Sequence, residues 1–294
     1  MKIDLHIHTK TCSDGNLSIK DVFKEAKRRN IDLMSITDHD SIDCQKKAIE
    51  LAKKMDISYI TGVELNVTFS LSYIYGTERK GKSISLDFLG YRYDIEDGEL
   101  KNKLKLIKEH RDKRALKILD KLNLEFELEG IKRFTKQDLK NIRDSVDGVF
   151  GRPHIANYLI KKGIVKDKQE AFDRYLVRCN VDKYPLTIKD ASKLIRDAGG
   201  ILVLAHPNDS YGTSLIKVSE DLDVQTEIVK EHMLKYIDGI ECWHSRHDEK
   251  TIKHLIKFAK KHNLIMTGGS DCHQKPILLG TIDIPDYVSD QFNL

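Results

Sequence analysis

The stretch Lys2-Ile3-Asp4-Leu5-His6-Ile7-His8 opens the sequence with apolar and polar residues in alternation. A period of two predicts a β-strand, because successive side chains of a strand point to opposite faces. His6 and His8 would share one face, with Cα atoms about 6.6 Å apart. Two imidazoles placed in this way can bind one metal ion, or they can be two hydrogen-bonded histidines of a polar strand face.

Strand-like and helix-like segments alternate outward from this stretch. Apolar residues at helical spacing predict helices over residues 18–29 and 42–54. Further strands are predicted over residues 31–37, 57–67 and 85–93. This order is typical of a mostly parallel sheet or barrel.

The pattern changes near residue 96, where the chain becomes poor in strands and rich in lysine. We interpret residues 96–184 as a helical insertion between two parts of one α/β domain, residues 1–95 and residues 185–294. The helices predicted from about residue 96 to residue 198 cover residues 99–122, 153–162, 168–177 and 188–198. Beyond these, the expected strands are 200–205, 239–242 and 264–267, and the expected helices are 224–236 and 248–262.

The composition limits the class of protein. Of 294 residues, 40% are hydrophobic and 33% are charged, which is enough apolar material for a core and too much for a disordered chain. The longest apolar run covers residues 201–205, far short of the ~20 residues of a membrane span, and the N-terminus does not resemble a signal peptide. The five cysteines are odd in number and lack a Cys-x-x-Cys pair, so we expect no disulfide scaffold and a cytoplasmic protein. The formal charge of +4 does not by itself favour nucleic-acid binding.

Candidate metal ligands lie at or near the ends of the predicted strands. Since the carboxyl ends of barrel strands converge on one face, we expect these side chains to form a single site. The segments concerned are Ser13-Asp14-Gly15, Thr37-Asp38-His39-Asp40, Gly62-Val63-Glu64, Ala205-His206-Pro207 and Gly269-Ser270-Asp271-Cys272-His273.

Together with His6-x-His8, these segments resemble the motif set of the PHP (polymerase and histidinol phosphatase) family of metal-dependent phosphoesterases. The motifs keep the family's order and span nearly the whole chain. Gly151-Arg152-Pro153-His154 and Gly239-Ile240-Glu241 further resemble the branch that contains 3',5'-nucleoside bisphosphate phosphatases, some of which also trim RNA from its 5' end.

The resemblance implies a distorted (β/α)7 barrel in which the helical insertion caps the substrate. It also implies two or three divalent ions, of manganese, iron or zinc. The ligands it implies are His6, His8, Glu64 and Asp271 for a first ion, Glu64 and His206 for a second, and Asp14, His39 and His273 for a third.

One position departs from the branch, where a histidine usually opens the segment that here begins Asp87-Phe88-Leu89. As a ligand, Asp87 would favour Mn²⁺ or Fe²⁺ over Zn²⁺ at the second position, because carboxylate is a harder donor than imidazole. The other interpretations are weaker occupancy of that position and a loop carboxylate in water.

Arginine and histidine residues indicate a phosphate-rich substrate. Arg111 and Arg114 fall on the otherwise apolar face of the helix predicted over 99–122, and arginine suits bidentate phosphate contact. Arg152 and His154 flank Pro153 at a predicted helix start, where free N–H groups favour an anion. The branch uses matching positions for substrate phosphate. Arginines extending past the helix edge and incidental polar residues are the alternatives.

We therefore expect a phosphomonoesterase acting on the 3'-phosphate of nucleoside 3',5'-bisphosphates, with divalent ions activating the attacking water. His154 or His247 is expected to protonate the leaving group. The substrate would be a small phosphorylated molecule, a nucleotide or short oligonucleotide, and we expect neither membrane attachment nor stable duplex binding. The alternatives are a histidinol-phosphate-type phosphatase, a 5'→3' exoribonuclease on short RNA and a non-catalytic, metal-stabilised binding domain.

Overall fold

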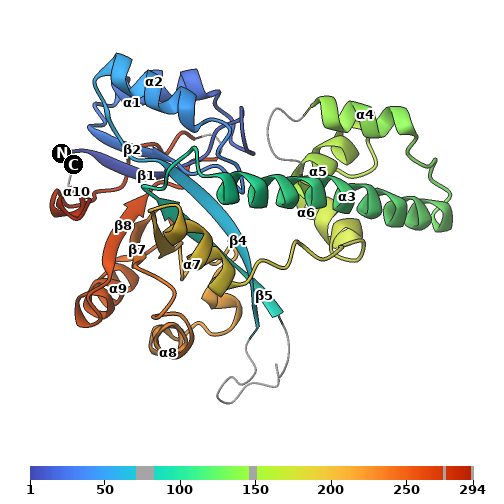
Figure 1. Ribbon diagram of the computed structural model, residues 1–294. Helices are drawn as coiled ribbons and strands as arrows, with labels where there is room; N and C mark the ends of the chain where they lie inside the picture. Colours follow the sequence, from blue (N-terminus) through green and yellow to red (C-terminus); the bar gives the residue numbers. More distant parts are fainter. Residues whose placement is uncertain (71–82, 146–150, 274–275, 293–294) are drawn as a thin grey trace.

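The computed structural model describes residues 1–70, 83–145, 151–273 and 276–292. A three-stranded parallel sheet begins the chain, with the strands β1 (Ile3–Ile7), β2 (Leu33–Ile36) and β3 (Ser58–Tyr59) in that order. The helices α1 (Ile19–Arg28) and α2 (Gln45–Met55) connect these strands, as predicted, and lie together on one side of them (Figure 1).

A second sheet has five strands in sequence order. Its parallel pairs are β6–β7 and β7–β8, whereas β4 pairs antiparallel with β5, and β5 with β6. Four of the six pairs in the two described sheets are thus parallel, as expected for a mostly parallel arrangement. The two antiparallel pairs, both made by β5, were not predicted, because alternating hydrophobicity predicts a strand without its direction. The strands are β4 (Gly62–Ser70), β5 (Ser83–Tyr91), β6 (Ile201–Leu204), β7 (Gly239–His244) and β8 (Ile265–Gly269).

The two sheets meet where the candidate ligands lie. Isolated bridges join Ile7 to Cys272 and His39 to Glu64, and the backbone N–H of Asp271 donates to the carbonyl of His6 (2.8 Å). The strand predicted over 57–67 is interrupted between β3 and β4, so that β4 belongs to the second sheet. The fold is mixed α/β as predicted, but the ladders of the described residues do not form one closed barrel.

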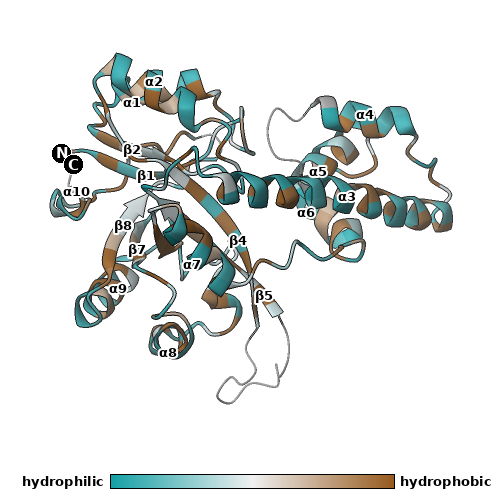
Figure 2. Ribbon diagram, in the orientation of Figure 1, coloured by the Kyte–Doolittle hydropathy of each residue, from teal (hydrophilic) through white to brown (hydrophobic). Residues whose placement is uncertain are grey.

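Helices α7 (Ile188–Asp197), α8 (Leu222–His232) and α9 (Glu249–Lys261) cover the second sheet, and α10 (Tyr287–Asp290) lies near the C-terminus (Figure 1). Figure 2 shows hydrophobic residues along β4 and mixed hydrophobic and hydrophilic faces on the helices. The largest hydrophobic cluster includes Val63, Leu89 and Ile240 from the strands and Ile195 and Leu255 from the helices. This packing holds the strand ends in place. No helix among the described residues is long and apolar enough to cross a membrane.

The segment predicted as a helical insertion forms a group of helices beside the sheets (Figure 1). The 31-residue helix α3 (Gly98–Leu128) packs Leu100, Leu104 and Ile107 into the main core, and its second half joins a separate core. Positions 146–150 of the predicted insertion lie outside the described residues. The other elements are α4 (Lys136–Asp144), α5 (Arg152–Lys161), α6 (Lys168–Ala171) and a π-helical turn (Phe172–Leu176).

Candidate metal centre

The candidate ligands converge on one cavity of about 640 Å³. His6 lies on β1 and Glu64 on β4. His206 lies two residues after the end of β6, and Asp271 lies two residues after the end of β8. His6 and His8 are buried and do not line the cavity, but they lie beside Glu64 and Asp271, which do. The ligands that line the cavity itself are Asp14, His39, Glu64, Asp87, His206, Asp271 and His273.

The donor atoms of the candidate ligands fall into three overlapping groups. In each group, every residue offers one donor atom, and these atoms all lie within 4.8 Å of one another. The groups share His8 and Glu64, so they form one continuous centre. They are His6/His8/Glu64, Glu64/Asp87/His206 and His8/Asp14/His39/His273. Asp271 adjoins the first group, since its Oδ1 lies 3.4 Å from His6 Nε2 and 3.3 Å from His8 Nε2.

The separations between donors suit metal ligation. Two ligands about 2.0–2.1 Å from one ion, at 90–110° to each other, lie about 2.9–3.4 Å apart. Glu64 Oε1 lies 3.0 Å from His206 Nε2, Glu64 Oε2 lies 3.2 Å from His8 Nε2, and Asp14 Oδ1 lies 3.3 Å from His273 Nε2. Within the described part of the chain, His6 Nε2, both ring nitrogens of His8, Glu64 Oε2 and Asp271 Oδ1 are buried without a hydrogen-bond partner. The donor set therefore fits divalent cations.

Neighbouring imidazoles hold two carboxylates of the centre in the ionised form. Burial alone would raise the pKa of Glu64, but the imidazoles of His39 and His6 hold it well below its usual range. The pKa of Asp271 is low for the same reason, with His273 and His6 outweighing burial. Both carboxylates are thus ionised at neutral pH, the form in which they bind metal.

Buried carboxylates orient the ligands from behind. Glu241 on β7 contacts His6 Nδ1 through Oε1 (3.0 Å) and accepts the backbone N–H of His206 through Oε2 (2.7 Å). Asp38 accepts the backbone N–H of Thr9 (2.6 Å) and its hydroxyl (2.8 Å), and burial raises the pKa of Asp38 to about 7. Both motifs stand out in the sequence, but neither of these roles was predicted. A carboxylate at a buried strand position is the signal that could have revealed Glu241.

Asp87 lies beside Glu64 and His206, as a second-position ligand must. Its Oδ1 accepts the Asn66 amide (2.5 Å) and its Oδ2 accepts the Thr213 hydroxyl. Burial raises the pKa of Asp87, with a further contribution from Glu64. Asp87 is therefore not a loop carboxylate in water, because its side chain is enclosed in the site.

The three predicted phosphate-binding arginines line the cavity with His154. Arg111 forms an ion pair with Asp40, and the guanidinium of Arg152 lies over the Phe172 ring. Arg114 donates to the carbonyl of Val181 (2.5 Å) and to Asn180 Oδ1 (2.7 Å), so it also supports the chain segment before Lys183.

Lys183 is a cavity-lining cation that was not predicted from the sequence. Burial lowers its pKa, although Asp87 opposes that effect. It belongs to a lysine-rich part of the sequence, so nothing distinguished it from the neighbouring lysines as a residue of the site.

The two candidate acids differ in position. His154 lines the cavity, and its Nδ1 accepts the backbone N–H of Gly151 (3.1 Å). That bond leaves the ring hydrogen of the neutral imidazole on Nε2. Burial lowers the pKa of His154 despite the opposing charge of Asp14.

His247 is not among the residues that line this cavity. Its Nδ1 lies 3.0 Å from the carbonyl of Cys242, its ring centroid lies 5.2 Å from that of His244, and burial lowers its pKa to about 4. His244 approaches the centre instead, with Nε2 3.4 Å from Asp271 Oδ2.

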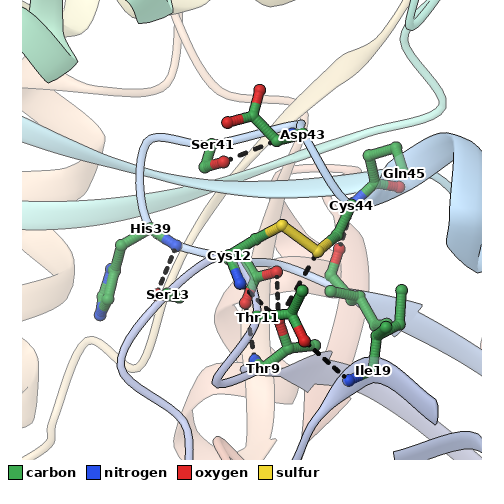
Figure 3. Close-up of a disulfide and its surroundings, with 12 residues drawn as sticks. Thr9, Thr11, Cys12, Ser13, Ile19, His39, Ser41, Asp43, Cys44 and Gln45 are labelled. Atoms are coloured by element: carbon green, nitrogen blue, oxygen red, sulfur yellow. Dashed lines mark hydrogen bonds between the residues drawn. A yellow bond between two sulfur atoms is a disulfide. The ribbon is translucent and has the colours of Figure 1, made fainter. Parts of the chain in front are cut away.

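A disulfide joins Cys12 to Cys44 beside the centre (Figure 3). The expectation of no disulfide scaffold did not anticipate this single bond, because the odd number and wide spacing of the cysteines conceal a pair that only folding brings together. Each cysteine belongs to a loop that carries a candidate ligand, Asp14 or His39. Cys179, Cys242 and Cys272 are buried free cysteines.

The fold and the centre define an α/β protein with overlapping groups of candidate metal ligands at and near its strand ends. Residues 4–191 match the family model for the PHP domain, and the chain belongs to that family. The predicted family is thus confirmed, and with it the class of enzyme, a hydrolase of phosphate esters.

Curated relatives match over most of the chain. A 5'-3' exoribonuclease of Haemophilus influenzae is 29% identical, over 92% of this chain and 90% of its own length. A 3',5'-nucleoside bisphosphate phosphatase of Chromobacterium violaceum is 27% identical, over 92% and 87%. The solved structure of an amidohydrolase from Chromobacterium violaceum, with bound sulfate and no metal, superposes with a TM-score of 0.75 at 27% identity, over 97% of this chain and 93% of that one.

Proposed function

We propose that this protein is a metal-dependent phosphomonoesterase that removes the 3'-phosphate of nucleoside 3',5'-bisphosphates. The observation that carries the proposal is the position of the cationic side chains. Arg111, Arg152 and Lys183 line the same cavity as the three overlapping ligand groups. If one phosphate of the substrate is bound at the ligand groups, these three cations can bind a second phosphate of the same molecule.

The metal ions would be held by the nine ligands proposed from the sequence, including Asp87, and manganese or iron suits the carboxylate-rich second group. When bound, such ions supply Lewis acidity and lower the pKa of water so that hydroxide is available at neutral pH. The ligands are His6, His8, Asp14, His39, Glu64, Asp87, His206, Asp271 and His273.

The chain's own residues bind and orient the substrate. The ion pair with Asp40 holds the Arg111 guanidinium in one direction at the cavity wall. His154 Nε2–H can donate to a phosphoryl oxygen, because Gly151 fixes the ring hydrogen on that nitrogen. We propose this binding role for His154 and not the acid role, since burial lowers its pKa and the neutral imidazole is a poor acid. We do not assign a role in proton transfer to His247, whose ring packs beside His244.

We propose four further features of the molecule. The two sheets form the distorted (β/α)7 barrel of the family, with residues 1–95 and 185–294 as its parts. Residues 96–184 form a substrate cap, supported by the separate core of these helices and by the cavity positions of Arg111, Arg152 and Phe172. The location is cytoplasmic, where nucleotide substrates are handled, and the substrate is a single nucleotide or short strand and not a stable duplex.

A phosphate-release assay with Mn²⁺ tests the proposal. We expect the protein to release phosphate from adenosine 3',5'-bisphosphate much faster than from histidinol phosphate. The Asp271→Asn variant should lose activity and bound metal. Asp223→Asn, at a side chain that is 95% exposed, should retain both. Equal activity on the two substrates would favour the histidinol-phosphate-type enzyme, and metal binding without turnover of either would favour a non-catalytic binding domain.

A second candidate activity is the shortening of RNA from its 5' end. The relative from Haemophilus influenzae, matched over 92% of this chain, favours it. With an end-labelled RNA oligomer, this activity would give a ladder of products, whereas a strict phosphatase would leave the oligomer length unchanged.

A further inference from the structure

Tyr211, in the loop after β6, is an exposed aromatic side chain that lines the cavity. It is 85% exposed, whereas the large apolar side chains of the core are buried. Leaving an aromatic ring in water forgoes the stabilisation that its burial would give. A ring presented at the mouth of a binding cavity therefore suggests a surface for a ligand.

A buried carboxylate holds the Tyr211 backbone and the arginine that lies over its ring. The Tyr211 backbone N–H donates to Asp209 Oδ1 (2.9 Å), and Asp209 Oδ2 accepts Arg246 Nη1 (2.7 Å). Asp209 is 1% exposed, so this arrangement is fixed from beneath. The Arg246 guanidinium lies 5.3 Å from the centroid of the Tyr211 ring.

The helical part of the chain contributes a similar pair to the same cavity. Phe172 and Arg152 both line it, with the guanidinium 5.4 Å from the ring centroid. Aromatic and guanidinium planes both stack on nucleobases, and this stacking tolerates any base because every base has a π-face.

We propose that Tyr211, held by Asp209 and Arg246, is the platform on which the nucleobase of the substrate stacks. The proposal rests on the proposed phosphatase function and adds a residue that selects nucleotides over other phosphate esters. A stacking contact of ordinary strength corresponds to a roughly 5- to 150-fold change in affinity.

The test compares adenosine 3',5'-bisphosphate with an abasic analogue that keeps both phosphates. Tyr211→Ala should raise KM for the nucleotide by roughly 5- to 150-fold, leave kcat nearly unchanged, and leave KM for the analogue unchanged. Tyr211→Phe should behave as the parent. Tyr287→Ala is the control, because Tyr287 is 41% exposed on α10 and is not among the cavity-lining residues.

Equal effects of Tyr211→Ala on both substrates, or no effect on either, would overturn the platform while leaving the phosphatase intact. If the parent hydrolyses neither compound, the proposed function is wrong, and the stacking role of Tyr211 is then tested by equilibrium binding. Adenosine 5'-monophosphate should then bind more weakly to Tyr211→Ala than to the parent, and equal binding would overturn the proposal.

The Cys12–Cys44 disulfide carries a second, independent inference, because it lies among the hydrogen bonds that position two candidate ligands (Figure 3). The Cys12 backbone N–H donates to Thr9 Oγ1 (3.1 Å), whose hydroxyl donates to Asp38. The His39 backbone N–H donates to Ser13 Oγ (3.1 Å). The loop that carries Asp14 and the loop that carries His39 are thus joined by these bonds and by one covalent bond.

We infer that Cys12 and Cys44 form a reversible redox-modification site whose oxidised state fixes the ligands Asp14 and His39. Oxidation removes two electrons and two protons from the two thiols and forms one S–S bond. A low-molecular-weight disulfide accepts them and leaves as two thiols, and a reductant reverses the reaction. Disulfides of cytoplasmic proteins are usually of this redox-responsive kind. Reduction removes the covalent tie and separates the sulfur atoms to van der Waals distance, which loosens both loops.

Mn²⁺ is the probe for this inference, because thiolates bind it poorly and the reduced cysteines will not compete for it. A phosphine reductant should weaken Mn²⁺ binding by the parent about 10-fold, the scale seen when groups that support metal ligands are lost. Reoxidation should restore the affinity. Cys44→Ser should bind weakly with or without reductant, and Cys179→Ser, at a buried free cysteine of the helical part, should behave as the parent.

Mass spectrometry without reductant should find the intact protein two hydrogen masses below the fully reduced form. A fully reduced mass after exposure to a low-molecular-weight disulfide would overturn the inference. So would equal Mn²⁺ affinity of the parent in both redox states, a comparison that does not depend on the folding of any variant.

Discussion

The substitution Glu241→Gln changes one oxygen to nitrogen behind the metal centre and keeps the side-chain volume. Glu241 is fully buried and accepts from two directions, from the His206 backbone N–H at 2.7 Å and from His6 Nδ1 at 3.0 Å. A glutamine has only one acceptor oxygen, and the His206 N–H can only donate. The amide oxygen must therefore face His206, and the amide NH₂ then faces His6 Nδ1.

This exchange changes the tautomer of His6. Facing an NH₂ group, Nδ1 must accept a hydrogen bond, so the ring hydrogen moves to Nε2. Nε2 is the atom that approaches Glu64 and Asp271, and a nitrogen that carries hydrogen cannot bind a metal. Loss of a group that orients a metal ligand typically weakens metal affinity 10- to 100-fold, or about 1.4–2.7 kcal/mol.

Titration of the metal-free proteins with Mn²⁺, followed by elemental analysis, measures the effect. Glu249→Gln is the matched control, because Glu249 is 81% exposed and pairs only with Lys253 among the described residues. Circular dichroism should show the same secondary structure for all three proteins. Parental Mn²⁺ affinity in Glu241→Gln would refute the reasoning about the His6 tautomer.

Three further predictions concern the centre and its surroundings. Gly269→Ala places a Cβ 2.4 Å from the backbone nitrogen of His6, so we expect a lower melting temperature and less bound metal. The control is Gly98→Ala, whose Cβ meets nothing within 4 Å; its metal content should be unchanged and its melting temperature unchanged or slightly higher. In the metal-free protein, burial lowers the pKa of His39, but Glu64 and its other acidic neighbours raise that pKa to about 9. Protons therefore compete with the metal for His39, and the Mn²⁺ affinity measured by calorimetry should rise from about pH 6 to pH 9. A flat profile would contradict this prediction. Arg152→Ala should raise KM for a nucleoside bisphosphate about 10-fold with a smaller effect on kcat, and an unchanged KM would remove Arg152 from the binding site.

The convergence of most candidate ligands could be predicted from the sequence, because they lie on or shortly after strands whose period is clear. The alternation in residues 2–8 determines which face carries His6 and His8, and the strand before Asp271 brings that residue to the same end. The direction of β5 did not follow from its sequence, because hydrophobic alternation is the same in parallel and antiparallel strands.

The features that were missed depend on contacts between distant segments. Cys12 and Cys44 are 32 residues apart, and only the packing of two loops brings them together. The helix α4 is short and polar, and its capping box at Thr135 and Asp138 is a weaker signal than a periodic apolar face. His247 follows a strand that ends at the site, yet a turn after His244 directs its ring toward Cys242.

Anomalous X-ray diffraction from crystals grown with excess Mn²⁺ tests the central claim most directly. The account predicts manganese peaks within the cluster of His6, His8 and Glu64 and in the neighbouring groups that contain His206 and His273. Imidazoles and carboxylates turned away from one another, with no anomalous signal between them, would contradict it.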